Sequence, residues 1–181
     1  MGIMVPRLFM VGLFTLLSVA AQGQAPAKSA AGTRSETRHL VAMTSASETV
    51  VAPGTRFSLV VDVAPKAKMH VYSPEQKDYL PISRTLDADG AFKSQPAVFP
   101  KAETYFFKAL EETQLVYSKP FRIVQDVTVA LTPAMRERAR TAGATLTITA
   151  TLKYQACDDA ICYLPVRVPL TWRVGLRGME R

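Results

Sequence analysis

The side chains best suited to chemistry are two cysteines, Cys157 and Cys162, the only ones among 181 residues. Cysteines separated by four residues can form a disulfide, exchange it with another thiol or bind a soft metal ion. A zinc site needs further ligands, and His39 and His70 are the only histidines in the chain. The spacing therefore favours a disulfide.

The segments on either side of the cysteines predict how they are held. Residues 144–153 and 166–173 each alternate apolar with polar side chains, which is the pattern of a half-buried strand. If residues 158–161 form a four-residue loop, the two strands make a hairpin and the cysteines face each other at its entry. Facing residues of antiparallel strands lie within the distance range of a disulfide.

The small size of the ring bears on whether this disulfide is structural or reactive. Closing about six residues stabilises a fold by only about 2 kcal/mol, compared with about 4.7 kcal/mol for a loop of about 100 residues. A disulfide with so small an effect is a candidate for one that opens and closes in use. A permanent cross-strand disulfide is equally compatible with the spacing.

Acidic residues follow the first cysteine directly. Asp158 and Asp159 disfavour a second negative charge beside them, and no helix is predicted to begin at Cys157 or Cys162. We therefore expect thiols that are poor spontaneous nucleophiles. This chemistry suits a passive electron carrier that reacts when a partner supplies the environment.

The N-terminus predicts export. Residues 1–23 carry Arg7 and then an apolar run at 8–21, which is too short to span a bilayer and is typical of a signal peptide. Cleavage is expected after Ala21 or Gly23. No second apolar segment reaches about 18 residues, so we expect no membrane insertion of the mature chain. The product reaches a compartment where a disulfide persists.

Composition limits the partners and cofactors. The formal charge of +7 becomes +6 once Arg7 is removed with the signal peptide, which favours acidic partners. The basic residues are scattered among the predicted strands and not clustered with aromatic ones, so we expect no nucleic-acid binding. The sequence has no glycine-rich phosphate loop or nucleophile elbow, and we expect no cofactor.

The remaining sequence predicts one all-β domain. Residues 24–37 are small and polar and predict a flexible linker, 38–175 the domain and 176–181 a tail. A short helix is predicted before the cysteine hairpin, with Thr132 as its cap and Gly143 as its end. The spacing of strands and turns predicts an immunoglobulin-like β-sandwich. Besides the hairpin, the predicted strands are 39–44, 48–52, 57–64, 69–73, 81–86, 91–99, 115–116 and 121–131.

The cysteine segment resembles a known active site. Residues 154–157 (YQAC), the acidic pair that follows, Cys162 and Pro165 resemble the active-site hairpin of the DsbD N-terminal domain. DsbD is a periplasmic thiol:disulfide interchange protein. Residues 69–73 (MHVYS) are similar to that family's early strand, which passes beneath the cysteines. The resemblance covers roughly residues 50–174.

The resemblance implies an immunoglobulin-like domain that carries electrons through a reversible Cys157–Cys162 disulfide. The pair would accept electrons from a membrane-embedded donor and pass them to thioredoxin-fold proteins in the periplasm. Cys162 would form the mixed disulfide with a partner, and Cys157 would resolve it. Tyr72 and Tyr163 would be neighbours of the active site.

The family also has a cap loop, with an aromatic side chain that lies over the cysteines when no partner is bound. Its best match here is residues 105–112, with Phe106 or Phe107 as the shield. Family proteins continue into a transmembrane domain, whereas this sequence ends at Arg181, so we expect the donor to be a separate polypeptide.

His70 departs from the resemblance, because some relatives have an aromatic residue there. In a strand His70 and Tyr72 point to the same face. His70 would then lie near the sulfurs and assist proton transfer, or would be hydrogen-bonded at the sheet surface.

Two other classes of function remain open. One is a structural or adhesive sandwich with a permanent disulfide and a binding surface elsewhere. The other is a periplasmic copper or zinc site formed by Cys157, Cys162, His70 and Met69, for which the soft ligands favour Cu(I).

Overall fold

The computed structural model of the chain describes residues 1–2, 32–108 and 111–179. The predicted signal peptide, residues 1–23, lies outside them apart from its first two residues, as do residues 24–31 of the predicted linker. The described residues form thirteen strands and one short helix in three sheets. The all-β immunoglobulin-like sandwich predicted from the sequence is thereby confirmed. Within these ranges, no helix is both long and apolar enough to cross a membrane.

Two sheets make up the sandwich, and all but one of their strand pairs are antiparallel. The first sheet contains, in spatial order, β1 (Arg34–Glu36), β2 (Leu40–Ala46), β4 (Arg56–Pro65), β10 (Phe121–Val129) and β7 (Phe92–Ser94). The second contains β3 (Val50–Val51), β13 (Val166–Leu176), β11 (Thr145–Tyr154) and β6 (Ser83–Leu86). The parallel pair is β3 with β13.

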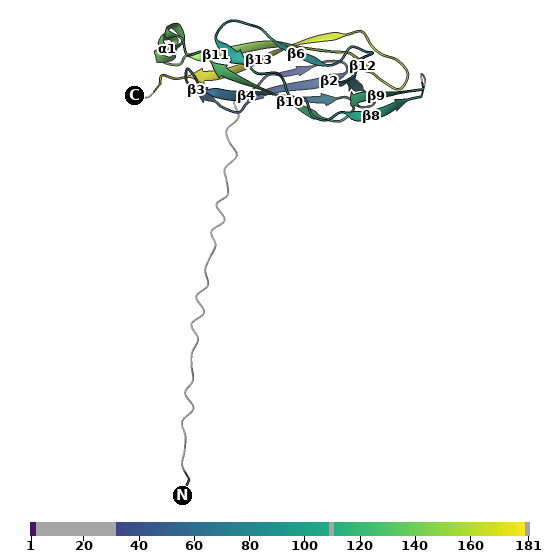
Figure 1. The fold of residues 1–181 in the computed structure, drawn as a ribbon, viewed down its shortest axis with the longest axis horizontal. Helices are drawn as coiled ribbons and strands as arrows, with labels where there is room; N and C mark the ends of the chain where they lie inside the picture. The colour runs from purple at the N-terminus through teal and green to yellow at the C-terminus, as the bar shows by residue number, and fades with distance from the viewer. Residues whose placement is uncertain (3–31, 109–110, 180–181) are drawn as a thin grey trace.

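A third, smaller sheet extends one end of the sandwich. Its strands, in spatial order, are β12 (Ala156–Cys157), β5 (His70–Tyr72), β9 (Glu112–Tyr117) and β8 (Glu103–Phe107). Figure 1 shows β8, β9 and β12 at one end of the elongated domain, with α1 at the other. The cysteine segment therefore lies far from the helix.

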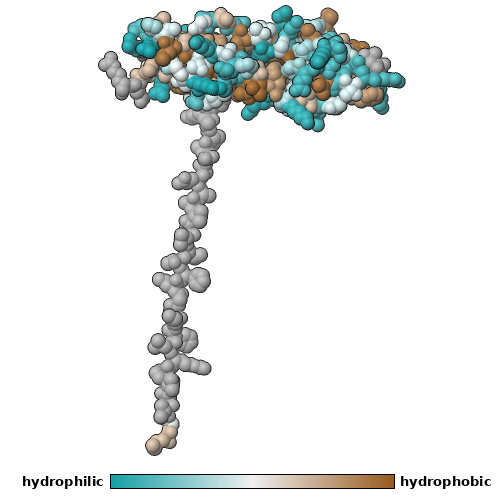
Figure 2. All heavy atoms as spheres, in the orientation of Figure 1, coloured by the Kyte–Doolittle hydropathy of each residue, from teal (hydrophilic) through white to brown (hydrophobic). Residues whose placement is uncertain are grey.

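The core follows the alternation seen in the sequence. Every second residue of β11 is buried, and β11 pairs with β13 from Thr145 to Tyr154 without a break. Trp172 on β13 crosses the interior, and its indole N–H lies within hydrogen-bond distance of the carbonyl groups of Ser45 and Val60 in the first sheet (3.0 and 3.2 Å). Hydrophilic and apolar residues are interspersed on the face shown in Figure 2. The two sheets thus share one apolar interior.

The predicted helix is present but shorter than expected. It spans Pro133–Arg140, begins with Thr132 accepting a hydrogen bond from the Met135 N–H (3.2 Å), and ends at Thr141. Gly143, the predicted terminator, instead lies in the turn that follows, with a φ of 71°. Glycine suits that position because left-handed backbone is costly for residues with a Cβ.

The last residues of the predicted linker, 24–37, are part of the fold. Arg34–Glu36 form strand β1, in which Arg34 pairs with Met43 of β2. The Ser35 hydroxyl donates to the carbonyl of Pro169 across the edge of the sandwich (3.3 Å). Three residues are too few to show a period in the sequence, so the composition indicated a linker.

Two other boundaries also differ from the predictions. The predicted strand at 91–99 ends early, as β7, because Pro96 has no N–H to donate to a neighbouring strand. Val98 then rejoins the sheet through a single bridge to Val124. At the C-terminus, Leu176 is the last residue of β13 and is buried, so the domain includes the first residue of the predicted tail.

Candidate active site

Cys157 and Cys162 form a disulfide at the tip of the predicted hairpin, with their Cα atoms 4.0 Å apart. The two residues pair as an antiparallel bridge. The Asp158 N–H donates to the carbonyl of Ile161 (2.9 Å), which closes the predicted four-residue loop. The sequence therefore predicts both the loop and the facing of its cysteines.

The two flanking strands do not continue to the cysteines as one hairpin. The pairing of β11 with β13 stops at Tyr154 and Val166. The chain then crosses to the third sheet, where β12 pairs with β5 so that Cys157 lies opposite His70. Cys157 is therefore positioned by the third sheet, which the sequence pattern does not predict.

The third sheet separates the main core from a small second cluster. Val71 and Ala156 belong to the main core, whereas Tyr72, Val116 and Cys157 form a cluster of their own. Residues opposite each other in the strand register point to the same side of a sheet. The cysteine side of this sheet is therefore a defined surface, which we call the redox face: Cys157, His70, Tyr72, Val116, Gln114, Glu112, Glu103, Tyr105 and Phe107.

Tyr72 is the polar side chain in contact with the sulfurs. Its hydroxyl oxygen lies 3.3 Å from Sγ of both Cys157 and Cys162. Neither sulfur of a disulfide carries a proton, so the hydroxyl is the donor. Burial, followed by the nearby Tyr79 and Glu112, raises the pKa of Tyr72 to about 12. Tyr72 therefore keeps its proton at neutral pH and can donate a hydrogen bond to a thiolate on either sulfur.

The two cysteines differ sharply in exposure. Cys157 is 1% exposed, whereas Cys162 is exposed. Two exposed apolar side chains, Ile161 and Leu164, lie close to Cys162 in the chain. A second protein can therefore approach Cys162 far more easily than Cys157.

Asp158 holds the loop between the cysteines. One carboxylate oxygen accepts from the N–H groups of Ala160 and Ile161 (2.8 Å each), and the other from the Tyr163 hydroxyl (2.8 Å). The backbone hydrogen bond from Ile161, then those from Ala160 and Tyr163, lower the pKa of Asp158 to about 2. Asp158 is therefore a structural part of the loop as well as the negative charge that the sequence predicts.

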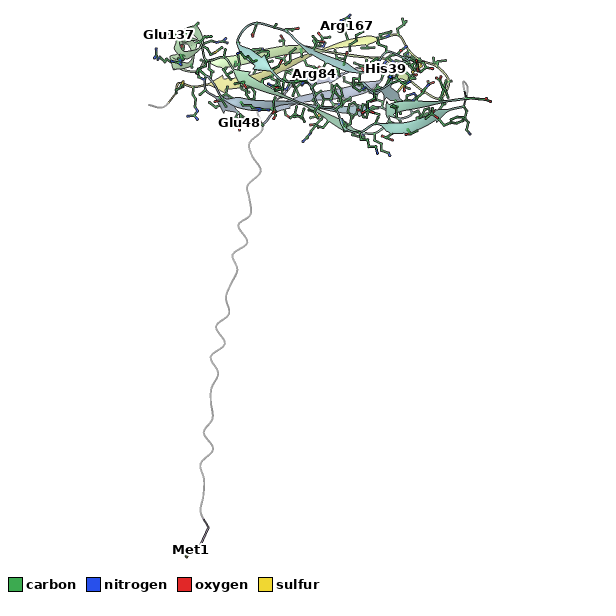
Figure 3. All side chains as sticks on the ribbon, viewed as in Figure 1. Met1, His39, Glu48, Arg84, Glu137 and Arg167 are labelled. Carbon is green, nitrogen blue, oxygen red and sulfur yellow. A yellow bond between two sulfur atoms is a disulfide. The ribbon has the colours of Figure 1, made fainter. Side chains whose placement is uncertain are left out.

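Tyr163 connects this loop to a buried histidine. Its ring packs at 4.6 Å from that of His39, and the Arg38 guanidinium lies 5.5 Å from its centroid. His39 is buried, lies toward the disulfide end of the domain in Figure 3, and has no hydrogen-bond partner on either ring nitrogen. Burial is the main cause of its lowered pKa.

Within the redox face, Tyr105 is the aromatic side chain that lies against the cluster containing Cys157. Its ring packs against the cysteine cluster and lies 4.8 Å from that of His70. Its hydroxyl donates to a carboxylate oxygen of Asp159 (2.7 Å). This bond connects β8 to the cysteine loop, so Tyr105 covers the redox face from the side of β8.

The two predicted shields, Phe106 and Phe107, lie on opposite sides of the third sheet. Alternation along β8 puts Phe106 on the opposite side of the sheet from Tyr105, where it is exposed. Phe107 lies on the same side as Tyr105 and is buried, with its ring 6.5 Å from that of Tyr105. The run of three aromatic residues at 105–107 has no alternation of polarity, so the sequence carries no signal for which of them lies over the cysteines.

His70 lies directly opposite Cys157 on the redox face. It is 3% exposed, and its Nε2 has no hydrogen-bond partner. Burial lowers the pKa of His70, while the negative charges of Asp159 and Asp158 act in the opposite direction. The prediction that His70 and Tyr72 share a face agrees with this arrangement, and their rings lie 6.0 Å apart.

Three residues of the site were not predicted from the sequence. The Tyr79 ring stacks on that of Tyr72 with centroids 4.5 Å apart, and its hydroxyl donates to Glu112. The buried Gln114 side chain also donates to Glu112 (2.7 Å). The alternation of Glu112, Gln114 and Val116 along β9 was the available signal, whereas Tyr79 lies in a segment without period.

Within the described ranges, no group of three or more histidine, cysteine, aspartate or glutamate side chains is arranged to hold a metal ion. No helix begins at either cysteine, and α1 lies at the other end of the domain (Figure 1). The chemistry that this arrangement supports is thiol–disulfide exchange at Cys162, with a buried second sulfur beside it.

Solved structures with a similar fold include the N-terminal periplasmic domain of ScsB from Proteus mirabilis. The TM-score is 0.53 at 8% identity, and the match covers 78% of this chain and 49% of that one. This chain thus spans about half the length of that protein. The N-terminal domain of DsbD from Neisseria meningitidis, in its reduced form, gives a TM-score of 0.41 at 18% identity, covering 72% of this chain and 82% of that one.

No curated protein sequence matches the chain significantly. One family model does match, described as thiol:disulfide interchange protein DsbD, N-terminal, over residues 37–169. The matched region contains both cysteines, the whole redox face and most of the sandwich. The chain therefore belongs to the family of the N-terminal domain of the thiol:disulfide interchange protein DsbD.

Proposed function

We propose that this chain is an exported thiol:disulfide interchange domain that carries electrons through a reversible Cys157–Cys162 disulfide to thioredoxin-fold proteins. The main support is that Cys162 is exposed whereas Cys157 is buried. An exposed Cys162 bonded to a buried Cys157 provides one site for an incoming thiol and one protected thiol to complete the exchange.

The exchange has two steps. In the direction that reduces a partner, the Cys162 thiolate attacks the partner's disulfide, forms a mixed disulfide and releases one partner thiolate. Cys157 then attacks Cys162, which restores the internal disulfide and releases the second partner thiolate. The Tyr72 hydroxyl, in contact with both sulfurs, stabilises the thiolate at each step.

Membership of the family supports the proposed partners and compartment. We place the domain in the periplasm after removal of a signal peptide at residues 1–23, with a membrane-embedded donor and thioredoxin-fold acceptors. The exposed Ile161 and Leu164 give such acceptors an apolar contact beside Cys162. Tyr105 covers the redox face until a partner displaces it.

A sandwich with a permanent structural disulfide is the main alternative, and the geometry favours it less. A structural disulfide is expected to join parts of the main core, whereas this one closes a short loop outside it. The copper or zinc alternative has weaker support still, because His70 and the two cysteines do not form a metal-binding group in the described residues.

Single cysteine variants test the proposal. Cys157→Ala, incubated with an oxidised thioredoxin-fold protein, should accumulate a mixed disulfide through Cys162, since no thiol remains to resolve it. Cys162→Ala should trap little, because Cys157 is buried. Equal trapping by the two variants would contradict the assignment of roles. Absence of trapping by either, with no exchange by the unchanged protein, would contradict the proposed function.

A further inference from the structure

His70 is a buried titratable side chain that the two exchange steps above do not use. It is 3% exposed, and its Nε2 has no hydrogen-bond partner. Buried polar atoms are nearly always paired in native proteins, so an unpaired one needs an explanation, and a redox or catalytic role is one of them. For His70 we look for that explanation in the reduced state of the protein.

The reduced state supplies a partner for this nitrogen directly opposite His70. His70 pairs with Cys157 in the register of β5 and β12, and such pairs place their Cβ atoms about 4.5–5.5 Å apart on one face. In the disulfide, the Cys157 sulfur is bonded to Cys162 and has no proton to donate. After reduction it becomes a thiol in a position that is only 1% exposed, where bulk water is a poor proton acceptor.

We propose, on the basis of the exchange function above, that His70 accepts the proton of the Cys157 thiol when this thiol resolves a mixed disulfide. The proton passes from Cys157 Sγ to His70 Nε2. The resulting thiolate attacks Cys162 Sγ, so that the Cys157–Cys162 bond forms. The bond between Cys162 and the partner breaks, and the partner sulfur leaves as a thiolate with the electron pair. His70 then returns the proton to this thiolate or to solvent.

The charges around His70 suit this role. Its neighbours are Cys157 on β12, Tyr72 on its own strand, Tyr105 on β8, and the carboxylates of Asp158 and Asp159 in the loop. Burial lowers the pKa of His70, which keeps the imidazole neutral and able to accept a proton. The two carboxylates favour the imidazolium once it has formed.

The test uses the whole chain in its reduced form and the aromatic disulfide dithionitrobenzoate. Attack by the first cysteine releases one coloured thiolate in a second-order phase, and resolution by the other releases a second in a first-order phase. In the unchanged protein, the first-order rate should stop rising with pH near or below about 6.5, the ordinary pKa of histidine. A rate that rises in proportion to hydroxide up to about pH 8.5, the ordinary pKa of cysteine, would overturn the proposal without any variant.

Substitutions make the test specific. His70→Gln and His70→Phe should slow the first-order phase about a hundredfold near pH 7, at the lower end of general-base effects, and make it proportional to hydroxide. The second-order phase should not change. His39→Gln replaces the only other histidine of the sequence, which packs against Tyr154 and Tyr163 and not in the third sheet, and should keep the rate and pH profile of the unchanged protein.

The outcomes separate this inference from the function on which it rests. If the unchanged protein shows both phases and the His70 variants show the same first-order rate and pH profile, only the role of His70 is wrong. If the unchanged protein releases no second thiolate, the cysteines do not exchange, and the proposed function itself fails.

Discussion

At the scale of single residues, Tyr72 is the side chain that most directly supports the proposed exchange at the disulfide. Among the described residues, it is the side chain whose hydroxyl contacts both sulfurs. The hydroxyl is buried and remains protonated, since its pKa is about 12. A donor held between two sulfurs can stabilise the thiolate of whichever one is released.

Removing that hydroxyl should make the reduced protein less reactive. Tyr72→Phe keeps the ring and its stacking but loses the donor. We expect alkylation of Cys162 by iodoacetamide near pH 7 to slow about tenfold, since hydrogen bonds to charged groups contribute about 1.5–3 kcal/mol. Tyr79→Phe is the matched control, because that hydroxyl donates to Glu112 and not to sulfur. Equal slowing in both variants would show that the contact with sulfur is not the cause.

Asp158 gives a prediction about pH. Hydrogen bonds lower its pKa from 3.8 to about 2, so its stabilisation of the loop is fully present above about pH 4 and is lost as the pH falls through about 2. The amide NMR signals of Ala160 and Ile161, its two backbone donors, should titrate with a midpoint near 2. Asp158→Asn should abolish this titration. A midpoint near 3.8 would mean that the three hydrogen bonds do not form in solution.

The site residues that could be predicted from the sequence are reactive side chains that lie close together in the chain. Cys157, Cys162 and the intervening acidic pair could be assigned because their arrangement depends on one short loop. Tyr79 and Glu112 could not, because they meet only through the packing of a loop against β9. Long-range packing of this kind has no local signature.

At the scale of elements, β8 decides which aromatic side chain covers the redox face. Tyr105 reaches Asp159 from β8, while the adjacent Phe106 points to the other side of the sheet. The sequence predicts a cap in this segment with Phe106 or Phe107 as the shield, and Phe107 shares the redox face with Tyr105. The run Tyr-Phe-Phe is apolar at every position, so it gives no alternation from which to read the register.

The hydrogen bond from Tyr105 to Asp159 should slow access to the disulfide. Tyr105→Phe keeps the ring but removes the bond, and we expect reduction by dithiothreitol to become several-fold faster, in line with about 0.5–1.5 kcal/mol for one hydrogen bond. Phe106→Ser changes the exposed neighbour on the opposite face and should leave the rate unaltered. Unchanged kinetics in Tyr105→Phe would show that this bond does not restrain the cover.

The long strands of the sandwich were predicted, whereas β1, β8 and β12 were not. Residues 144–153 and 166–173 alternate cleanly because one side faces the sandwich core, and they correspond to β11 and β13. Strands β1 and β12, of three and two residues, are too short for a period. They form because neighbouring strands offer them partners, which is a tertiary effect.

At the scale of the whole molecule, two clusters are divided by the third sheet. The large cluster lies between the sandwich sheets and the small one contains Cys157 with Tyr72 and Val116. The two sandwich sheets are also joined by the buried Arg84 of β6, which donates to Gln125 of β10 and lies 5.7 Å from the Trp172 ring, near the middle of the domain in Figure 3. The disulfide closes one short loop, so it connects neither the two clusters nor the two sandwich sheets to each other.

Reduction should therefore leave the fold intact. The ring of the Cys157–Cys162 disulfide adds at most about 2 kcal/mol, and each kcal/mol shifts the melting temperature of a domain of this size by about 2–4 °C. We expect the oxidised and reduced proteins to melt within about 8 °C of each other and to give superimposable far-ultraviolet circular dichroism spectra. Trp172 fluorescence, which reports on the sandwich core, should be the same in both forms. The double variant Cys157→Ala/Cys162→Ala serves as the control that cannot reoxidise, and it should melt with the reduced form. If reduction unfolds the protein, the disulfide supports the sandwich after all, and a carrier that must cycle between both forms is excluded.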